Sequence, residues 1–279
     1  MSSVAITASD VNKLRQMTGA GMMDCKKALT EANGDFEAAV DFLRKKGQKV
    51  AGNRADRDAN EGVVIARVSA DNSRAVLVVL NCETDFVAKN QDFIDFTTKI
   101  SDIALNTKPA DVDALLAASF DGLPISERIN EQVGKIGEKM ELHYSQLEAP
   151  FVVAYNHPGN RLATIVAFNK AGVAGIETVA KDVSMQAAAM APVAVDKDDV
   201  DTHTLERELD IAREQIRAEG KPEEMVEKIA AGKLNKFYKD NTLLNQEFVK
   251  DNKMSVRQYI QTIDKDLTVT AFKRHALGN

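Results

Sequence analysis

Ala75-Val76-Leu77-Val78-Val79-Leu80-Asn81 is an apolar run rich in β-branched residues, and it follows Val64-Ile65-Ala66-Arg67 after a turn at Asp71-Asn72. This composition predicts two buried strands joined as a hairpin. A similar pattern returns downstream as Val152-Val153-Ala154-Tyr155, a turn at Pro158-Gly159-Asn160, and Ala163 to Asn169. The chain therefore contains an internal repeat of two hairpins.

Each hairpin is followed by a helical pattern. Phe93, Phe96, Ile100 and Ile103 keep helical spacing after the first hairpin, and a helix is expected from Ile176 to Met190 after the second. The two helices align in register after a gap in the second half, and that gap lies opposite Asp85 to Asn90. We therefore predict an α+β fold whose core consists of two repeated half-domains with antiparallel sheets.

The second half also contains a charged helical insertion. Residues 202–240 form two apolar stripes on either side of Gly220-Lys221-Pro222, which predicts an antiparallel helical hairpin. Beyond it, a helix over Ser255–Ile263 and a strand over Leu267–Phe272 are expected to return to the sheet.

The first fifty residues predict a small three-helix bundle. Thr7 and Asp10 form a capping box, Gly19 and Gly21 separate the first two helices, and Gly47 is expected to end the third. A polar stretch over 52–60 is the predicted linker. The predicted domains are therefore 1–54, 55–143 and 144–279, with the helical hairpin at about 202–240 inside the last.

An acid and a phenylalanine stand directly after the first apolar strand, in Asn81-Cys82-Glu83-Thr84-Asp85-Phe86-Val87-Ala88-Lys89-Asn90. This is a strand-to-helix connection with no nucleophile and base pair. An exposed Phe86 beside a charge would suit a protein-protein contact. A loop phenylalanine is more often buried, so the segment alone favours an inward-facing Phe86.

A second stretch reads Leu14-Arg15-Gln16-Met17-Thr18-Gly19-Ala20-Gly21-Met22-Met23-Asp24-Cys25-Lys26-Lys27-Ala28-Leu29. Together the two stretches resemble translation elongation factor Ts, the nucleotide-exchange factor of the GTPase elongation factor Tu, and the resemblance covers almost the whole chain. It implies that the N-terminal bundle is a ubiquitin-associated-type domain. It also implies that Thr84, Asp85, Phe86 and Val87 disturb the Mg²⁺ site of the GTPase.

The resemblance further implies secondary contacts with the GTPase. They involve Leu14, Arg15, Thr18, Gly19, Ala20, Gly21, Met22 and Met23 in the bundle, and Met185 and Gln186 in the second-half helix. Related factors often have a histidine where Gln186 stands, and a glutamine cannot become cationic. The Ala-Met composition of this helix suits a partner surface and suits a protein core slightly better.

Composition and motifs argue against several other classes. A chain of 279 residues with 44% hydrophobic content can form one large core or two to three domains, and its net charge of -6 argues against a general nucleic-acid binder. No P-loop occurs, and the four histidines lack zinc-ligand spacing. We expect no metal, no cofactor, no membrane span and a cytoplasmic location.

The sequence therefore predicts a non-enzymatic guanine-nucleotide exchange factor that binds elongation factor Tu in its GDP-bound and nucleotide-free states. One alternative is a binding module in which the bundle recruits another protein and the repeated core is a scaffold. A second is an enzyme with Cys25 or Cys82 as nucleophile and a histidine as base. The oligomeric state stays open, a homodimer included.

Overall fold

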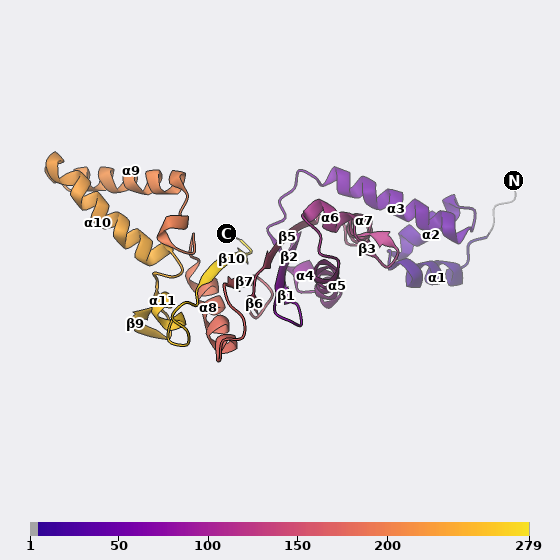
Figure 1. Cartoon of the computed structure of the whole chain (residues 1–279). Coiled ribbons are helices and arrows are strands. Elements are labelled where there is room, and N and C mark those ends of the chain that lie inside the picture. The colour runs from indigo at the N-terminus through magenta and orange to yellow at the C-terminus, as the bar shows by residue number, and fades with distance from the viewer. Residues whose placement is uncertain (1–4, 279) are drawn as a thin grey trace. The chain divides into compact units, whose positions relative to one another are not determined.

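The computed structural model describes residues 5–278, and this part of the chain divides into two compact units (Figure 1). Unit 1 extends to Ile65, continues from Val78 to Ser145 and also includes the chain from Leu277. Unit 2 consists of Ala66–Leu77 and Gln146–Ala276, so the tip of the first hairpin belongs with the second half of the chain. The predicted domain limits at residues 54 and 143 are those of the sequence pattern and stay a prediction.

Unit 1 starts with a bundle of the helices α1 (Ala8–Thr18), α2 (Met22–Glu31) and α3 (Phe36–Asn53). The predicted capping box at Thr7 and Asp10 is present, and Asp35 caps α3 by accepting a hydrogen bond from the Ala38 N–H at 2.9 Å. The bundle has a core of its own, made of Val11, Leu14, Cys25, Ala28, Leu29 and Ala39.

The prediction that Gly47 ends the third helix is wrong. α3 passes through Gly47 and ends at Asn53, so it also takes up the start of the predicted linker. Gly47 is buried against helix α7 (Ile125–Ile136), where the two backbones approach too closely for a side chain. The glycine therefore reflects a helix-helix contact, which the sequence pattern alone does not distinguish from a helix end.

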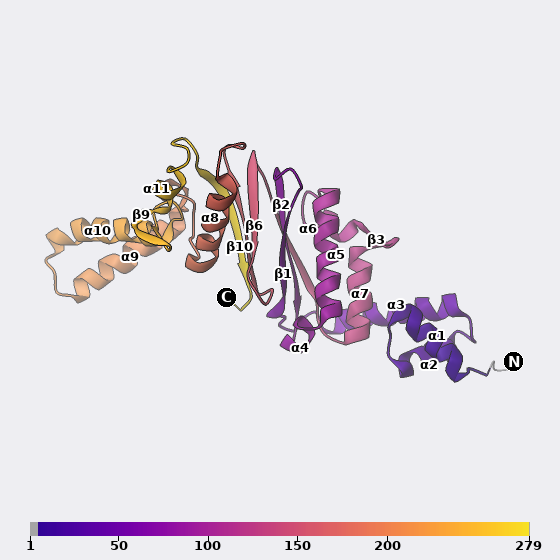
Figure 2. The ribbon, with the colours of Figure 1, turned by 90° about the horizontal axis from the view of Figure 1, so that it is seen from below.

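The first sheet has the strand order β1-β2-β5, with β1 (Glu61–Val68), β2 (Arg74–Cys82) and β5 (Glu141–Glu148). Strand β2 is buried along its whole length, as its apolar sequence predicts. The elements that follow β2 are α4 (Asp85–Ala88), α5 (Gln91–Thr107), α6 (Val112–Ala117), the short strands β3 (Ser119–Phe120) and β4 (Leu123–Pro124), and α7. In Figure 2, α5 lies along the face of the β1-β2 hairpin.

Unit 2 contains the second sheet, whose antiparallel strand order is β10-β7-β6, with β6 (Phe151–Asn156), β7 (Leu162–Phe168) and β10 (Val269–Ala276). Helix α8 (Ile176–Met190) has the predicted bounds and packs on this sheet (Figure 2). Phe151, Phe168 and Val183 are among the side chains of the core between them. Hairpin, helix and sheet thus recur in both halves, and the predicted α+β class is confirmed.

The remaining elements of unit 2 are a 3-10 turn (Lys197–Asp199), α9 (Thr202–Ala218), α10 (Glu223–Asn241), β8 (Glu247–Phe248), β9 (Asp251–Ser255) and α11 (Val256–Ile260). Helix α11 is shorter than predicted. Strand β10 starts later than predicted, because the Leu267 N–H donates to the Asp264 carbonyl oxygen and the Thr268 N–H to the Asn169 side chain.

Helices α9 and α10 form the predicted hairpin. Its turn contains Gly220 in the left-handed region at φ 73°, and Pro222 directly precedes α10. Ala212, Ile216, Val226 and Ala230 make a separate small core between the two helices. Within residues 5–278, no helix has the length and apolar content needed to cross a membrane.

Candidate partner-binding site

The segment after β2 makes two helix starts in close succession. Thr84 caps α4 by accepting a hydrogen bond from the Val87 N–H at 3.5 Å, and Asn90 caps α5 by accepting one from the Asp92 N–H at 2.8 Å. Each cap satisfies backbone donors that the first turn of a helix leaves unpaired. The chain therefore makes a defined corner at residues 84–90.

Phe86 lies on the outside of this corner and is 84% exposed. The expectation of an inward-facing Phe86, drawn from the loop alone, is therefore wrong. Ala88 is the residue of α4 that is buried, and it occupies the inward side of this single turn. An exposed aromatic side chain on an ordered turn can serve as an anchor of the kind found in binding hot spots.

Asp85 stands beside Phe86 and is paired with Lys89, whose Nζ donates to its carboxylate at 2.6 Å. This hydrogen bond holds the pKa of Asp85 below its ordinary value, so the group is ionised near neutral pH. The side chain is 45% exposed and can exchange Lys89 for another donor. Asp85 and Phe86 thus present a hydrogen-bond acceptor and an apolar ring side by side.

Two carboxylates that the sequence analysis did not single out hold this corner. Glu138 accepts hydrogen bonds from the N–H groups of Glu83 and Thr84, at 3.0 and 3.1 Å, and from the Thr84 hydroxyl at 2.6 Å. Glu83 accepts from Arg54 at 2.7 Å, Arg57 at 3.0 Å and the Lys139 N–H at 2.6 Å. Only the tertiary structure brings these groups together, since Glu138 is remote from Thr84 in the sequence.

The N-terminal candidates form a second exposed group. Met17, Met22 and Met23 are exposed around the Gly19-Ala20-Gly21 connection between α1 and α2. Leu14 is fully buried in the bundle core, so its side chain is not available to a partner. Thr18 is tied to the same core, because its hydroxyl donates to the Leu14 carbonyl oxygen at 2.7 Å.

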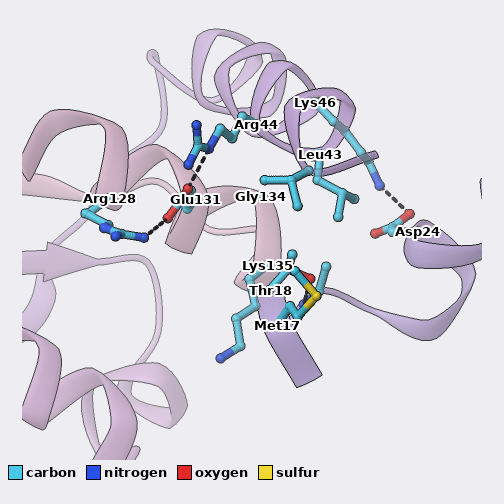
Figure 3. A pocket seen from close by; sticks show the side chains of 12 residues that line it. Met17, Thr18, Asp24, Leu43, Arg44, Lys46, Arg128, Glu131, Gly134 and Lys135 are labelled. Carbon is cyan, nitrogen blue, oxygen red and sulfur yellow. Dashed lines mark hydrogen bonds and ion pairs between the residues drawn. The ribbon is translucent and has the colours of Figure 1, made fainter. Parts of the chain in front are cut away.

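Met17, Thr18 and Ala20 also border a pocket of about 230 Å³ between the bundle and α7 (Figure 3). Its wall carries Arg44, Glu131 and Arg128 in a row, with Glu131 accepting from Arg44 at 3.1 Å and from Arg128 at 2.9 Å. Lys46 is paired with Asp24 on the opposite rim. Most of the charges around this pocket are therefore already paired within unit 1.

The candidates in α8 are largely enclosed. Gln186 is fully buried, and its amide donates to Gln246 and to the Glu247 carbonyl oxygen, both at 3.1 Å. Its carbonyl oxygen accepts from the Val249 N–H at 2.9 Å. Met185 is half-buried, and Met190 at the end of the helix is exposed. As α8 is packed here, Gln186 serves the interior of unit 2.

The two thiols are poorly suited to nucleophilic chemistry. Cys25 and Cys82 are buried, and burial raises the pKa of both, that of Cys82 to about 12. A thiolate is therefore scarce at neutral pH. Across residues 5–278, no cluster of three or more His, Cys, Asp or Glu side chains is placed to hold a metal ion.

Comparison with known proteins gives a consistent result. A family model described as Elongation factor TS matches residues 83–279. Proteins named Elongation factor Ts from Christiangramia forsetii and Cytophaga hutchinsonii are each 54% identical to this chain, over 98% of it and 99% of their own length. One from Porphyromonas gingivalis is 51% identical over 99% of each chain.

The fold, the exposed corner and these matches place the chain among the translation elongation factors. It belongs to the elongation factor Ts family.

Proposed function

We propose that this chain is a guanine-nucleotide exchange factor for elongation factor Tu and acts by binding, with no catalytic residue or cofactor of its own. The observation that carries the proposal is the exposure of Phe86 on an ordered corner, within the segment that the family resemblance associates with exchange. Phe86 inserts as an apolar wedge between elements of the GTPase. Asp85 makes polar contacts that stabilise these elements in their displaced position.

GDP on such a GTPase is held by a bridging Mg²⁺ and by backbone N–H groups around the phosphates, so displacing either weakens its binding. The free energy for this displacement comes from binding at two places. These are the exposed methionines of the bundle, Met17, Met22 and Met23, and the corner at residues 84–90. By linkage, GDP weakens the binding of the factor as much as the factor weakens the binding of GDP. The factor therefore binds both the GDP-bound and the nucleotide-free GTPase and favours the latter.

The direct test is the release of labelled GDP from the Tu protein of the same organism, with and without this chain. We expect release to accelerate in proportion to the concentration of the chain, until Tu is saturated. An unchanged release rate at concentrations where the two proteins demonstrably form a complex would contradict the proposal.

The double substitution of Met22 and Met23 by serine should weaken Tu binding about tenfold, as expected for exposed side chains that become buried in an interface. Both side chains lie outside the bundle core, so the thermal unfolding of the variant should match that of the parent. Calorimetric titration with Tu measures the affinity. Met225 on the hairpin has a comparable exposure, and Met225→Ser is the matched control.

Substitution is a sharper test of docking than removal of residues 1–54. Helix α3 packs closely on α7, and truncation would uncover that face of α7 as well as remove the methionines. If the double variant binds Tu with the parental affinity, the bundle does not dock through this surface.

Replacing residues 202–240 with a short Gly-Ser link should leave GDP release detectable. The hairpin has its own small core, but buried Gln246 donates to the Asp240 carbonyl oxygen at 3.0 Å. Unit 2 should therefore stay folded and lose about 1 to 3 kcal/mol of its unfolding free energy. Circular dichroism and GDP-release kinetics on the same preparation check both statements. Complete loss of release in a folded variant would assign the hairpin a direct contact with Tu.

A further inference from the structure

Phe86 does not fix its own direction. The helix that carries it, α4, spans only Asp85–Ala88, and so short a helix is not stable by itself. The ring of Phe86 is 84% exposed and gains little from packing. The direction in which it points must therefore be set by the residues that hold the turn before it.

Glu138 is placed so that its side chain can hold the turn before Phe86. Helix α7 ends at Ile136. Gly137 follows in the left-handed region at φ 83°, and Glu138 is the next residue. Its three hydrogen bonds come from two consecutive residues, Glu83 and Thr84. A carboxylate that accepts from two successive backbone N–H groups and a hydroxyl restrains both the position and the rotation of the turn.

Glu83 makes the reciprocal hydrogen bond between the two segments. The N–H of residue 83 donates to Glu138, while the N–H of residue 139 donates to the Glu83 carboxylate. The side chain of Glu83 is only 15% exposed, and Arg54 and Arg57 bind it from the segment that follows α3. Strand β2, the end of α7 and the end of α3 thus meet at residues 83 and 84.

The charge of Glu83 persists under all ordinary conditions. The hydrogen bond from the Lys139 N–H, followed by those from Arg54 and Arg57, lowers the pKa of Glu83 from 4.5 to about 2. Because the pKa of Glu83 is lower in the folded protein than in the unfolded chain, its ionisation stabilises the folded state at pH values above about 4.5. This stabilisation is lost as the pH falls from about 4.5 towards 2. The contact is therefore fully formed near neutral pH.

We propose that Glu138 and Glu83 are positioning residues of the exchange reaction, which hold Thr84–Val87 so that Asp85 and Phe86 face the partner before it binds. This inference rests on the proposed function. A wedge that is ordered in advance loses less conformational entropy on binding, and more of the binding energy remains available to distort the GTPase.

The test compares Glu138→Ala and Glu138→Gln with the parent chain. Hydrogen exchange of the Glu83, Thr84 and Val87 amides is measured in the free protein, and GDP release is measured at saturating and at limiting concentrations of the factor. Glu138→Ala should increase amide exchange at these positions and lower the saturating release rate by about tenfold, with little change in the concentration that gives half the maximal rate. Glu138→Gln retains an acceptor oxygen, so it should restore part of the amide protection and part of the saturating release rate.

Asp264→Ala is the matched control. Asp264 lies in unit 2 and accepts hydrogen bonds from Lys170 at 2.9 Å and from the Asp266 N–H at 2.8 Å, and the hydrogen bonds described for it do not reach the corner. Its loss should leave the amides of residues 83–87 and the saturating release rate unchanged. If Glu138→Ala fails to fold, Thr84→Val removes the hydroxyl that donates to Glu138. The same hydroxyl caps α4, so only the Glu83 and Thr84 amides report on the Glu138 contact in this variant.

Unchanged amide protection in Glu138→Ala would overturn the positioning role, whatever the release rate. Slower release with full protection would also overturn it, because Glu138 would then act as a direct contact. If the parent chain does not accelerate the release of GDP from Tu, the proposed function is contradicted. The amide measurements in the free protein would still decide whether Glu138 orders the turn.

Discussion

Phe86→Ala should slow the factor-stimulated release of GDP from elongation factor Tu by about thirtyfold or more, the effect expected for an aromatic hot spot worth at least about 2 kcal/mol. The free energy of unfolding should change little, because the ring is 84% exposed. Stopped-flow release of a fluorescent GDP and thermal unfolding of the same preparation measure the two quantities.

Phe168→Ala is the corresponding control, since Phe168 is fully buried in the core of unit 2. It should reduce the unfolding free energy by about 3 to 5 kcal/mol, as large-to-small core substitutions do. If Phe86→Ala instead behaves like Phe168→Ala, the ring has a structural role. If Phe86→Ala melts and exchanges normally, the corner has no part in exchange.

Asp85→Ala should also slow GDP release, and its effect should be less than additive with that of Phe86→Ala, because the two neighbouring side chains act at one site. The ion pair between Asp85 and Lys89 is exposed, so its loss should have little effect on stability. Full additivity of the two effects would indicate that the residues act independently.

The architecture was largely predictable because it follows from periodicity. Strand β2 has a β-branched apolar run, the hairpin and helix recur in the second half, and the turn of the charged helical hairpin contains glycine and proline. These are local signals, and each element forms for reasons that are written in its own residues.

The candidate site was less accessible to such reasoning, because its geometry depends on contacts between distant segments. The sequence gives no sign that Glu138 binds the turn at Thr84, and the usual burial of phenylalanine points in the wrong direction for Phe86. Leu14 lies in a stretch that is similar to a partner-binding motif, yet its helical spacing with Val11 already suited the core. The role of the other candidates as partner contacts stays a prediction.

Gly47 is a second residue whose role the sequence pattern does not indicate, and it leads to a further prediction with a large effect on stability. A Cβ atom at Gly47 would lie 2.6 Å from the Asn130 carbonyl oxygen, and one at Gly134 would lie 2.8 Å from the Gly47 Cα atom. Both obstacles are backbone atoms, which cannot turn away as a flexible side chain can. Helices α3 and α7 can therefore keep this distance only with glycine at the crossing.

Gly47→Leu should lower the unfolding free energy by about 3 kcal/mol, at the upper end of the range for overpacked cores. Gly52→Leu is the matched control, because it makes the same change on the same helix at an exposed position with nothing within 4 Å of the added Cβ. Leucine is the better helix former, so this control should be neutral or more stable by about 0.5 to 1 kcal/mol. Urea unfolding followed by circular dichroism measures both.

The consequence should extend to the corner that carries Phe86. Arg54 and Arg57 follow α3 directly, and both bind Glu83, so a variant that separates α3 from α7 should also loosen that contact. Hydrogen exchange of the Glu83 and Thr84 amides should therefore increase in Gly47→Leu and stay unchanged in Gly52→Leu. Equal stability and equal amide exchange in the two variants would mean that the bundle is held by something other than this glycine contact.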